Sequence, residues 1–280
     1  MKNLFKSYLL FFTSLFILFS PIAQDEYLDS LYVELENESN YNEQTKLLLS
    51  IGEYQPIFRT SYWDTIVSRC GSISELQQTK ALALNNIGFI ADMNGDLNEA
   101  ETHFKESIDL FLLLKDTSKA ADGIYNLAVH YQDIGEYGMS LELMNKAMSF
   151  YKKIKKPSSV GEVYNGLAVT YDYLGNPLKA IQNYDSAYTI LSNLKDTFKM
   201  ANVLTNLATI HSDLGDLETA KKYYFQSNSL YLSLDKANQE NILTNLNNIA
   251  TIYWAEGDTE KAKQTFESNL TINTQFDNQI

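Results

Sequence analysis

Three histidines and one cysteine are the residues from which a metal site or a nucleophile could be built. His103, His130 and His211 lie in different parts of the sequence and at different positions of its pattern, whereas a zinc site needs several ligands around one ion. Cys70 alone provides no disulfide, and we interpret it as a small buried hydrophobe. No glycine-rich phosphate loop, nucleophile elbow or His-Glu-x-x-His segment occurs. The sequence therefore predicts a protein that is not an enzyme and holds no metal and no cofactor.

The charge balance excludes one class of partner. The 280 residues contain 22 basic and 35 acidic side chains, which gives a formal net charge of −13. Nucleic-acid binding depends on clustered Lys and Arg, so no nucleic-acid partner is expected. Because 45% of the residues are hydrophobic, the chain is not a disordered acidic polymer either.

The N-terminus has the order of a secretory signal peptide. Lys2 and Lys6 precede an apolar run over residues 9–20, and the small-residue segment Pro21-Ile22-Ala23 follows it. The run is shorter than the roughly 20 residues that a membrane helix needs, so cleavage after Ala23 is favoured over retention as an anchor. We expect an exported protein, periplasmic or secreted, with no membrane span after cleavage.

The rest of the chain repeats with a period of about forty residues. A glycine marks each repeat: Gly95, Gly135, Gly175, Gly215 and Gly257. Five residues after it comes a small residue: Ala100, Ser140, Ala180, Ala220 and Ala262. Nine residues after it comes a large one: Phe104, Met144, Tyr184, Tyr224 and Phe266. Offsets of three, four and seven are helical, and a glycine can end a helix in the left-handed conformation. Each repeat is therefore predicted to be two helices joined at the glycine.

The residue after the glycine is suited to start the second helix. Four repeats place an N-capping residue there: Asp96, Asn176, Asp216 and Asp258. One helix pair cannot bury its apolar face alone, so the pairs are expected to stack.

This pattern resembles the tetratricopeptide repeat (TPR) in its longer, 40-residue version, over Ala81 to about Ile272. The resemblance implies an all-α fold, a right-handed α-solenoid of stacked antiparallel helix pairs forming a superhelix. We predict a signal peptide at 1–23 and an irregular helical cap at 24–80, in which Tyr41–Tyr54 and Ile57–Cys70 pair and Trp63 is buried. Five helix-hairpin units follow at 81–120, 121–160, 161–200, 201–242 and 243–280.

In TPR proteins the first helix of each pair lines a concave face where peptides bind. The 15 residues that end at each glycine contain no Lys or Arg and seven acids: Asp92, Asp122, Asp133, Glu162, Asp172, Asp213 and Glu256. Burial alone would deplete acids as well. We therefore expect an acidic groove.

Asparagines recur in the same segments, nine or ten residues before the glycine. They allow two interpretations: the amides bind a peptide backbone, or they cap neighbouring helices or bridge adjacent units. Aromatic side chains on the same predicted face could accept apolar or cationic groups. The predicted peptide-binding groove comprises Asn85, Asn86, Phe89, Asp92, Tyr125, Asn126, Asp133, Asn165, Asp172, Tyr173, Asn206, Asp213, Asn247, Asn248 and Trp254.

We therefore predict a non-enzymatic protein-interaction scaffold of the cell envelope that binds a neutral to basic peptide or protein segment. The alternative is the N-terminal sensor or regulatory module of a longer envelope signalling protein, of the histidine kinase or DNA-binding regulator type. The last unit has no polar closing helix, since Phe266, Leu270, Ile272 and Phe276 leave an apolar edge. This edge either self-associates or is covered by further modules.

Overall fold

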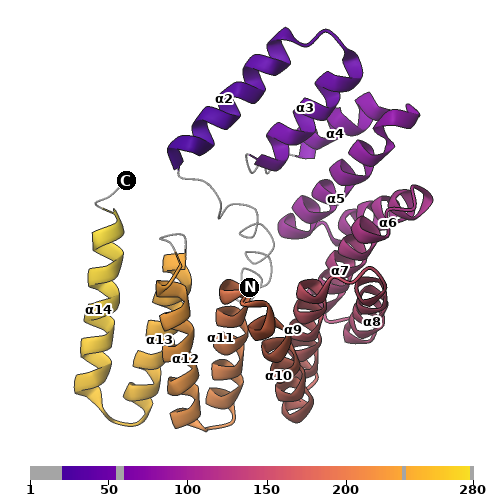
Figure 1. The fold of residues 1–280 in the computed structure, drawn as a ribbon. Helices are drawn as coiled ribbons and strands as arrows, with labels where there is room; N and C mark the ends of the chain where they lie inside the picture. The colour runs from indigo at the N-terminus through magenta and orange to yellow at the C-terminus, as the bar shows by residue number, and fades with distance from the viewer. Residues whose placement is uncertain (1–20, 55–59, 235–237, 278–280) are drawn as a thin grey trace. The chain divides into compact units, whose positions relative to one another are not determined.

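The computed structural model describes residues 21–54, 60–234 and 238–277, and side chains within 27–54, 60–234 and 238–269. Every regular element in these ranges is helical (Figure 1). The N-terminal helices are α2 (Pro21–Asn37), α3 (Tyr41–Tyr54), α4 (Thr60–Cys70) and the 3-10 turn η1 (Ser74–Leu76). The repeats follow as α5 (Gln77–Asn94), α6 (Leu97–Leu113), α7 (Thr117–Asp133), α8 (Tyr137–Lys153), α9 (Pro157–Tyr173), α10 (Pro177–Leu194), α11 (Thr197–Asp213), α12 (Leu217–Leu232), α13 (Gln239–Ala255) and α14 (Thr259–Asp277). The fold is the expected all-α solenoid of stacked antiparallel helix pairs.

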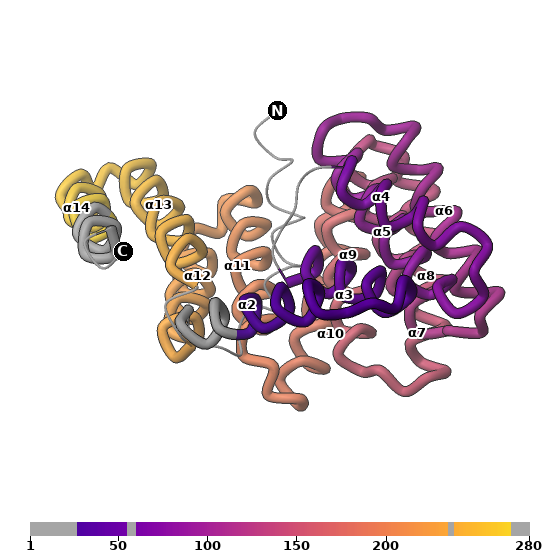
Figure 2. Tube along the Cα trace, turned by 90° about the horizontal axis from the view of Figure 1, so that it is seen from above, coloured from indigo at the N-terminus to yellow at the C-terminus, as the bar shows by residue number. Residues whose placement is uncertain are grey.

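The chain divides into two bodies, an N-terminal body (residues 1–155) and a C-terminal body (residues 156–280). Within the N-terminal body the chain passes from α2 to α8, and each helix of the series α4 to α8 packs on the next. Within the C-terminal body the same holds from α9 to α14 (Figures 1 and 2). We number the helix pairs from repeat 1 (α5 and α6) to repeat 5 (α13 and α14).

The glycine turns end the first helices as expected. Gly95, Gly135, Gly175, Gly215 and Gly257 all have positive φ, between 67° and 86°. At the first of these turns the Asp96 amide donates to the Ala91 carbonyl and the Gly95 amide to the Asp92 carbonyl. This is the Schellman arrangement, in which a residue without a side chain avoids the steric cost of the left-handed conformation.

The turns between repeats use the same conformation without a glycine. Lys115, Lys155 and Lys195 have φ of 60°, 55° and 57°, and they too recur every forty residues. The Lys195 amide donates to Ser192, and the Asp196 amide to Leu191. These turns cannot be recognised in the sequence, because lysine carries no signal for positive φ.

Three of the four predicted N-capping residues make a capping hydrogen bond. Asn176, Asp216 and Asp258 accept hydrogen bonds from the backbone amides of the third residue onward. Asp96 is likewise the N-cap residue of α6, but its side chain makes no capping hydrogen bond. Asp116 and Asp196, at the turns between repeats, do cap the helices that follow them.

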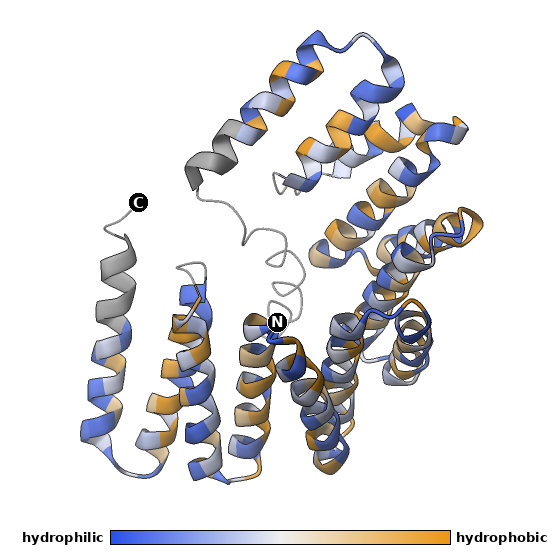
Figure 3. Cartoon of the chain, in the orientation of Figure 1, coloured by the Kyte–Doolittle hydropathy of each residue, from blue (hydrophilic) through white to orange (hydrophobic). Residues whose placement is uncertain are grey.

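The periodic residues form the core. The small residues five after the glycine and the large residues nine after it are buried in repeats 1 to 4. Colouring by hydropathy shows apolar and polar positions alternating around each helix (Figure 3). Seven residues before each turn glycine, repeats 2 to 5 have alanine and repeat 1 has Gly88, where a Cβ would lie 3.0 Å from the Phe104 ring.

The two ends of the array differ. In the N-terminal body Trp63 and Cys70 are buried between α3, α4 and α5, as expected, and burial raises the pKa of the Cys70 thiol. In repeat 5 Phe266 is 43% exposed. The other predicted edge residues, Leu270, Ile272 and Phe276, lie outside the residues whose side chains are described, and so does the apolar run at 9–20.

Candidate functional site

Four of the seven predicted groove acids already have partners within their own body. The Asp122 carboxylate accepts from the Tyr151 hydroxyl at 2.8 Å, and Asp92 lies 2.8 Å from His130. Glu162 pairs with Lys199 at 3.0 Å, and Glu256 with Lys221 at 2.8 Å. Asp133, Asp172 and Asp213 are the remaining carboxylates. The negative charge expected of the groove is therefore confined to these three aspartates.

The first helices also carry more positive charge than the 15-residue windows indicated. They begin earlier than those windows, and their first turns carry Lys80, Lys119 and Lys199. Lys199 lies between Glu162 and Asp196, at 3.0 and 3.3 Å. This lysine neutralises the acids at the start of α9 and α11, so the negative charge lies toward the other end of these helices.

The asparagines bridge adjacent repeats. The Asn126 amide on α7 donates to the Asn85 oxygen on α5 at 3.0 Å. In the C-terminal body Asn206 on α11 donates to Asn165 on α9, also at 3.0 Å. The bridging interpretation is thus confirmed for these four residues. Each bond uses one N–H group and one oxygen, which leaves the donor's carbonyl oxygen and the acceptor's N–H groups for other partners.

The asparagines of repeat 5 are held differently. Asn247 accepts from Asn269 on α14 at 2.9 Å, and Asn248 donates to the Tyr224 hydroxyl of repeat 4 at 3.1 Å. Asn86 in repeat 1 is half-buried. Asn247 and Asn248 thus stabilise the packing of their own repeat and of its neighbour.

A carboxylate pair accompanies each asparagine pair. Asp92 on α5 and Asp133 on α7 act on each other electrostatically in the N-terminal body. Asp172 on α9 and Asp213 on α11 do so in the C-terminal body. Each aspartate follows its asparagine by seven residues, two helical turns on the same face.

The two sets of four residues are offset by 80 positions. Asn85, Asp92, Asn126 and Asp133 correspond to Asn165, Asp172, Asn206 and Asp213. The array therefore contains a double repeat on top of the forty-residue period. The 80-residue spacing can be read from the sequence, but it is not visible when every repeat is aligned at a period of forty residues.

Burial separates the two carboxylate pairs. Burial and the Asp92 charge raise the pKa of Asp133 to about 7, although His130 acts in the opposite direction. Burial, then the Asp213 charge, also raises the pKa of Asp172. Asp213 itself is exposed, so this second pair is open to water and to a ligand.

The predicted aromatic residues divide in the same way. Phe89 and Tyr125 in the N-terminal body are half-buried. In the C-terminal body Tyr173 is 44% exposed and Trp254 is 66% exposed. Large exposed aromatic side chains are typical of binding surfaces, so the predicted groove residues of the C-terminal body are the more accessible ones.

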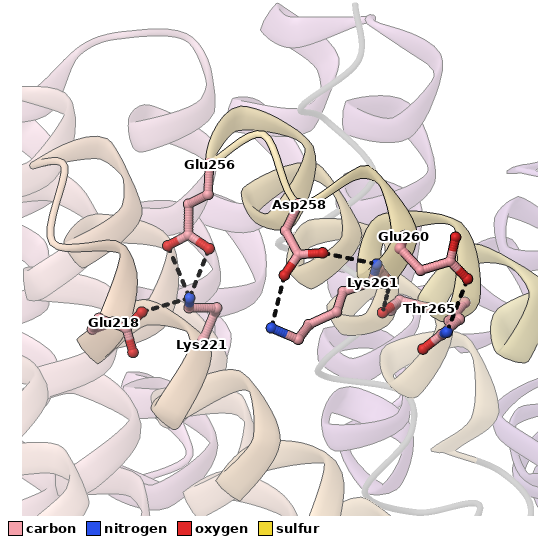
Figure 4. Close-up of polar contacts among 8 residues, drawn as sticks. Glu218, Lys221, Glu256, Asp258, Glu260, Lys261 and Thr265 are labelled. Atoms are coloured by element: carbon pink, nitrogen blue, oxygen red, sulfur yellow. Dashed lines mark hydrogen bonds and ion pairs between the residues drawn. The ribbon is translucent and has the colours of Figure 1, made fainter.

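Figure 4 shows the Lys221–Glu256 ion pair, which joins repeats 4 and 5, and two ion pairs that each lie within a single repeat. The Lys221 ammonium on α12 contacts Glu218 and Glu256, and it lies 5.0 Å from the Tyr253 ring. Lys261 pairs with Asp258 at the start of α14. Because Lys221 is only 9% exposed, Glu256 contributes to the packing between repeats.

No group of three or more His, Cys, Asp or Glu side chains in the described ranges could hold a metal ion. His211 lies 3.1 Å from Asp216, and His103 lies 3.8 Å from both Glu99 and Glu106. Within the same ranges, no helix is both long and apolar enough to cross a membrane.

The helix pairs, their glycine turns and their small-to-large packing define the class of repeat solenoids. The tetratricopeptide repeat model matches residues 119–193 and 199–275, and a second model of that repeat matches residues 81–111. These matches cover more than half of the chain, which therefore belongs to the tetratricopeptide repeat family. A comparison with curated protein sequences finds no match.

Solved structures share the fold at low sequence identity. BtubC (BKLC) from P. vanneervenii is 17% identical with a TM-score of 0.67, over 78% of this chain and 89% of that one. NprR in complex with its cognate peptide NprX is 18% identical with a TM-score of 0.61, over 90% and 78%. A Rap protein complexed with competence and sporulation factor is 14% identical with a TM-score of 0.67, over 91% and 78%.

Proposed function

We propose that this protein is a non-enzymatic scaffold that binds a neutral to basic peptide or protein segment along the first helices of its repeats. The observation that carries the proposal is the paired arrangement of Asn165 with Asn206 and of Asp172 with Asp213 in the C-terminal body. Amides can bond a peptide backbone of any sequence, while carboxylates two turns away favour a basic side chain. The structures of NprR with NprX and of a Rap protein with its factor support a peptide ligand.

Selection from a random peptide library on the purified protein, residues 24–280, tests this proposal. We expect selected peptides to be enriched in Lys and Arg, and to bind more weakly as salt rises. The double variant Asp172→Asn and Asp213→Asn should weaken binding about threefold to tenfold, since each exposed ion pair contributes roughly 0.2–1 kcal/mol.

The matched control is the double variant Asp109→Asn and Asp185→Asn, which removes two exposed acids from second helices. It changes the net charge equally and should leave peptide affinity within about twofold. Equal losses in the two double variants would show that net charge alone attracts the peptides. Selection without basic enrichment would refute the acidic half-site.

We also propose that the protein is exported to the periplasm or secreted. Lys2, Lys6 and the apolar run at residues 9–20, followed by Ala23, support this. N-terminal sequencing of the protein from fractionated cells should give a mature chain that begins at Gln24. An intact N-terminus in the cytoplasmic fraction would contradict it.

A further inference from the structure

A buried polar cluster in the N-terminal body is not explained by ligand binding. His130 on α7 is 0% exposed and Asp92 on α5 is 4% exposed, and His130 Nδ1 lies 2.8 Å from Asp92 Oδ1. Three atoms of the cluster are buried without a hydrogen-bond partner in the described structure: Asp92 Oδ2, His130 Nε2 and Asp133 Oδ2. Buried polar atoms are normally satisfied, so this group requires an explanation.

The unsatisfied atoms lack a proton donor. Asp92 Oδ2 and an ionised Asp133 Oδ2 can only accept, and Nε2 of a neutral His130 that donates through Nδ1 can only accept as well. With His130 neutral, the cluster holds two carboxylate charges, and with His130 protonated one remains. Burying net charge is unfavourable, so the cluster gains by taking up protons.

The surrounding helices do not supply the missing charge. On α6 the Glu101 carboxylate is occupied by Lys105 and by the Tyr131 hydroxyl. The charges that act on Asp133 are those of Asp92 and His130. Helix α8 packs on α7, but none of its charged residues is among the causes of the raised pKa of Asp133. These residues are Glu142, Lys146, Lys152 and Lys153. The aromatic rings of Phe104 and Tyr131 lie 6.2 and 5.5 Å from the His130 ring, so an apolar wall surrounds it.

We propose that the buried Asp92 and His130, together with the half-buried Asp133, form a proton-binding site, through which acidification strengthens the contact between repeats 1 and 2. The site joins the first helices of these two repeats, α5 and α7, which the Asn85–Asn126 bond also joins. Protonation of Asp133 removes the repulsion between its carboxylate and that of Asp92. This effect of protonation does not depend on the binding of any ligand.

The direction of the pH effect follows from proton linkage. The pKa of Asp133 is raised to about 7 in the folded protein, whereas an unfolded Asp titrates near 3.9. Between about pH 4 and pH 7 the folded protein binds a proton that the unfolded chain has released. The contribution of this site to stability is therefore largest at low pH, falls as pH rises through 7, and is lost above it.

Two measurements on the full mature chain test the proposal. Carboxyl carbon NMR should give a titration midpoint near 7 for Asp133, which falls by at least half a pH unit in Asp92→Asn because the like charge is removed. Thermal unfolding should be measured for wild type and Asp133→Asn at pH 5 and at pH 8. Relative to wild type, the Tm of the variant should be higher at pH 8 than at pH 5 by roughly 3 °C.

The matched control is Asp109→Asn on α6 of the same body, where the side chain is exposed. Its Tm should follow that of wild type at both pH values. Asp133 titrating near pH 4, or unfolding curves of Asp133→Asn that parallel wild type, would overturn the proposal. Asp92→Asn is a second check if Asp133→Asn folds poorly, since its amide oxygen can still accept from His130.

Discussion

The two carboxylate pairs occupy equivalent positions, eighty residues apart, yet their environments differ. Asp92 in the N-terminal body contacts a buried histidine, His130, which also acts electrostatically on Asp133, whereas the equivalent residue in the C-terminal body is the apolar Ile210. Asp92 is buried whereas its equivalent Asp172 is half-buried, and Asp133 is half-buried whereas its equivalent Asp213 is exposed to solvent. The same pair of residue types therefore suits a structural proton-binding site in one body and a ligand site in the other.

A second difference concerns how consecutive repeats are joined. Six residues after the glycine of the turn, repeat 1 has Glu101 and repeat 4 has Lys221. Glu101 accepts from the Tyr131 hydroxyl of repeat 2, whereas Lys221 lies over the Tyr253 ring of repeat 5 and pairs with Glu256. At this position of the repeat, an acidic side chain (Glu101) or a basic one (Lys221) can therefore contact the equivalent tyrosine of the next repeat.

The largest effect is expected for His130→Ile, which gives the N-terminal body the residue of the C-terminal body. It leaves the Asp92 carboxylate buried without a partner, so the free energy of unfolding should fall by about 3 kcal/mol. Urea unfolding followed by circular dichroism measures it. Adding Asp92→Asn should recover at least half of the loss. A single variant within 0.5 kcal/mol of wild type would mean that Asp92 needs no partner.

The smallest effect is expected where the bodies agree, at the lysine turns. Lys195→Gly should raise the free energy of unfolding by about 0.5 kcal/mol, because the relief of its left-handed conformation exceeds the entropy of an added glycine. Lys115→Gly should do the same in the N-terminal body. The control Asn193→Gly, in the last helical turn, should cost about 0.5 kcal/mol. Losses at all three positions would show that the turns are unstrained.

The fold could be predicted because its determinants are local and periodic. Glycines at positive φ, small residues at close helix contacts and large residues between pairs all recur at a fixed spacing. Each requirement is met by one residue type at one position of the repeat, so a single sequence contains several copies of the evidence. The lysine turns escaped because their conformation comes from hydrogen bonding around the turn and not from the residue type.

The residues of the candidate site stay a prediction from the sequence, and their partners are known only from the structure. The sequence alone determined that asparagines and aspartates recur on the first helices. Only the tertiary structure decided that Asn126 bonds Asn85, that Glu162 and Glu256 are neutralised by lysines, and that His130 meets Asp92. Hydrogen bonds and ion pairs join residues on different helices, and their partners depend on how those helices pack, which a periodic pattern does not specify.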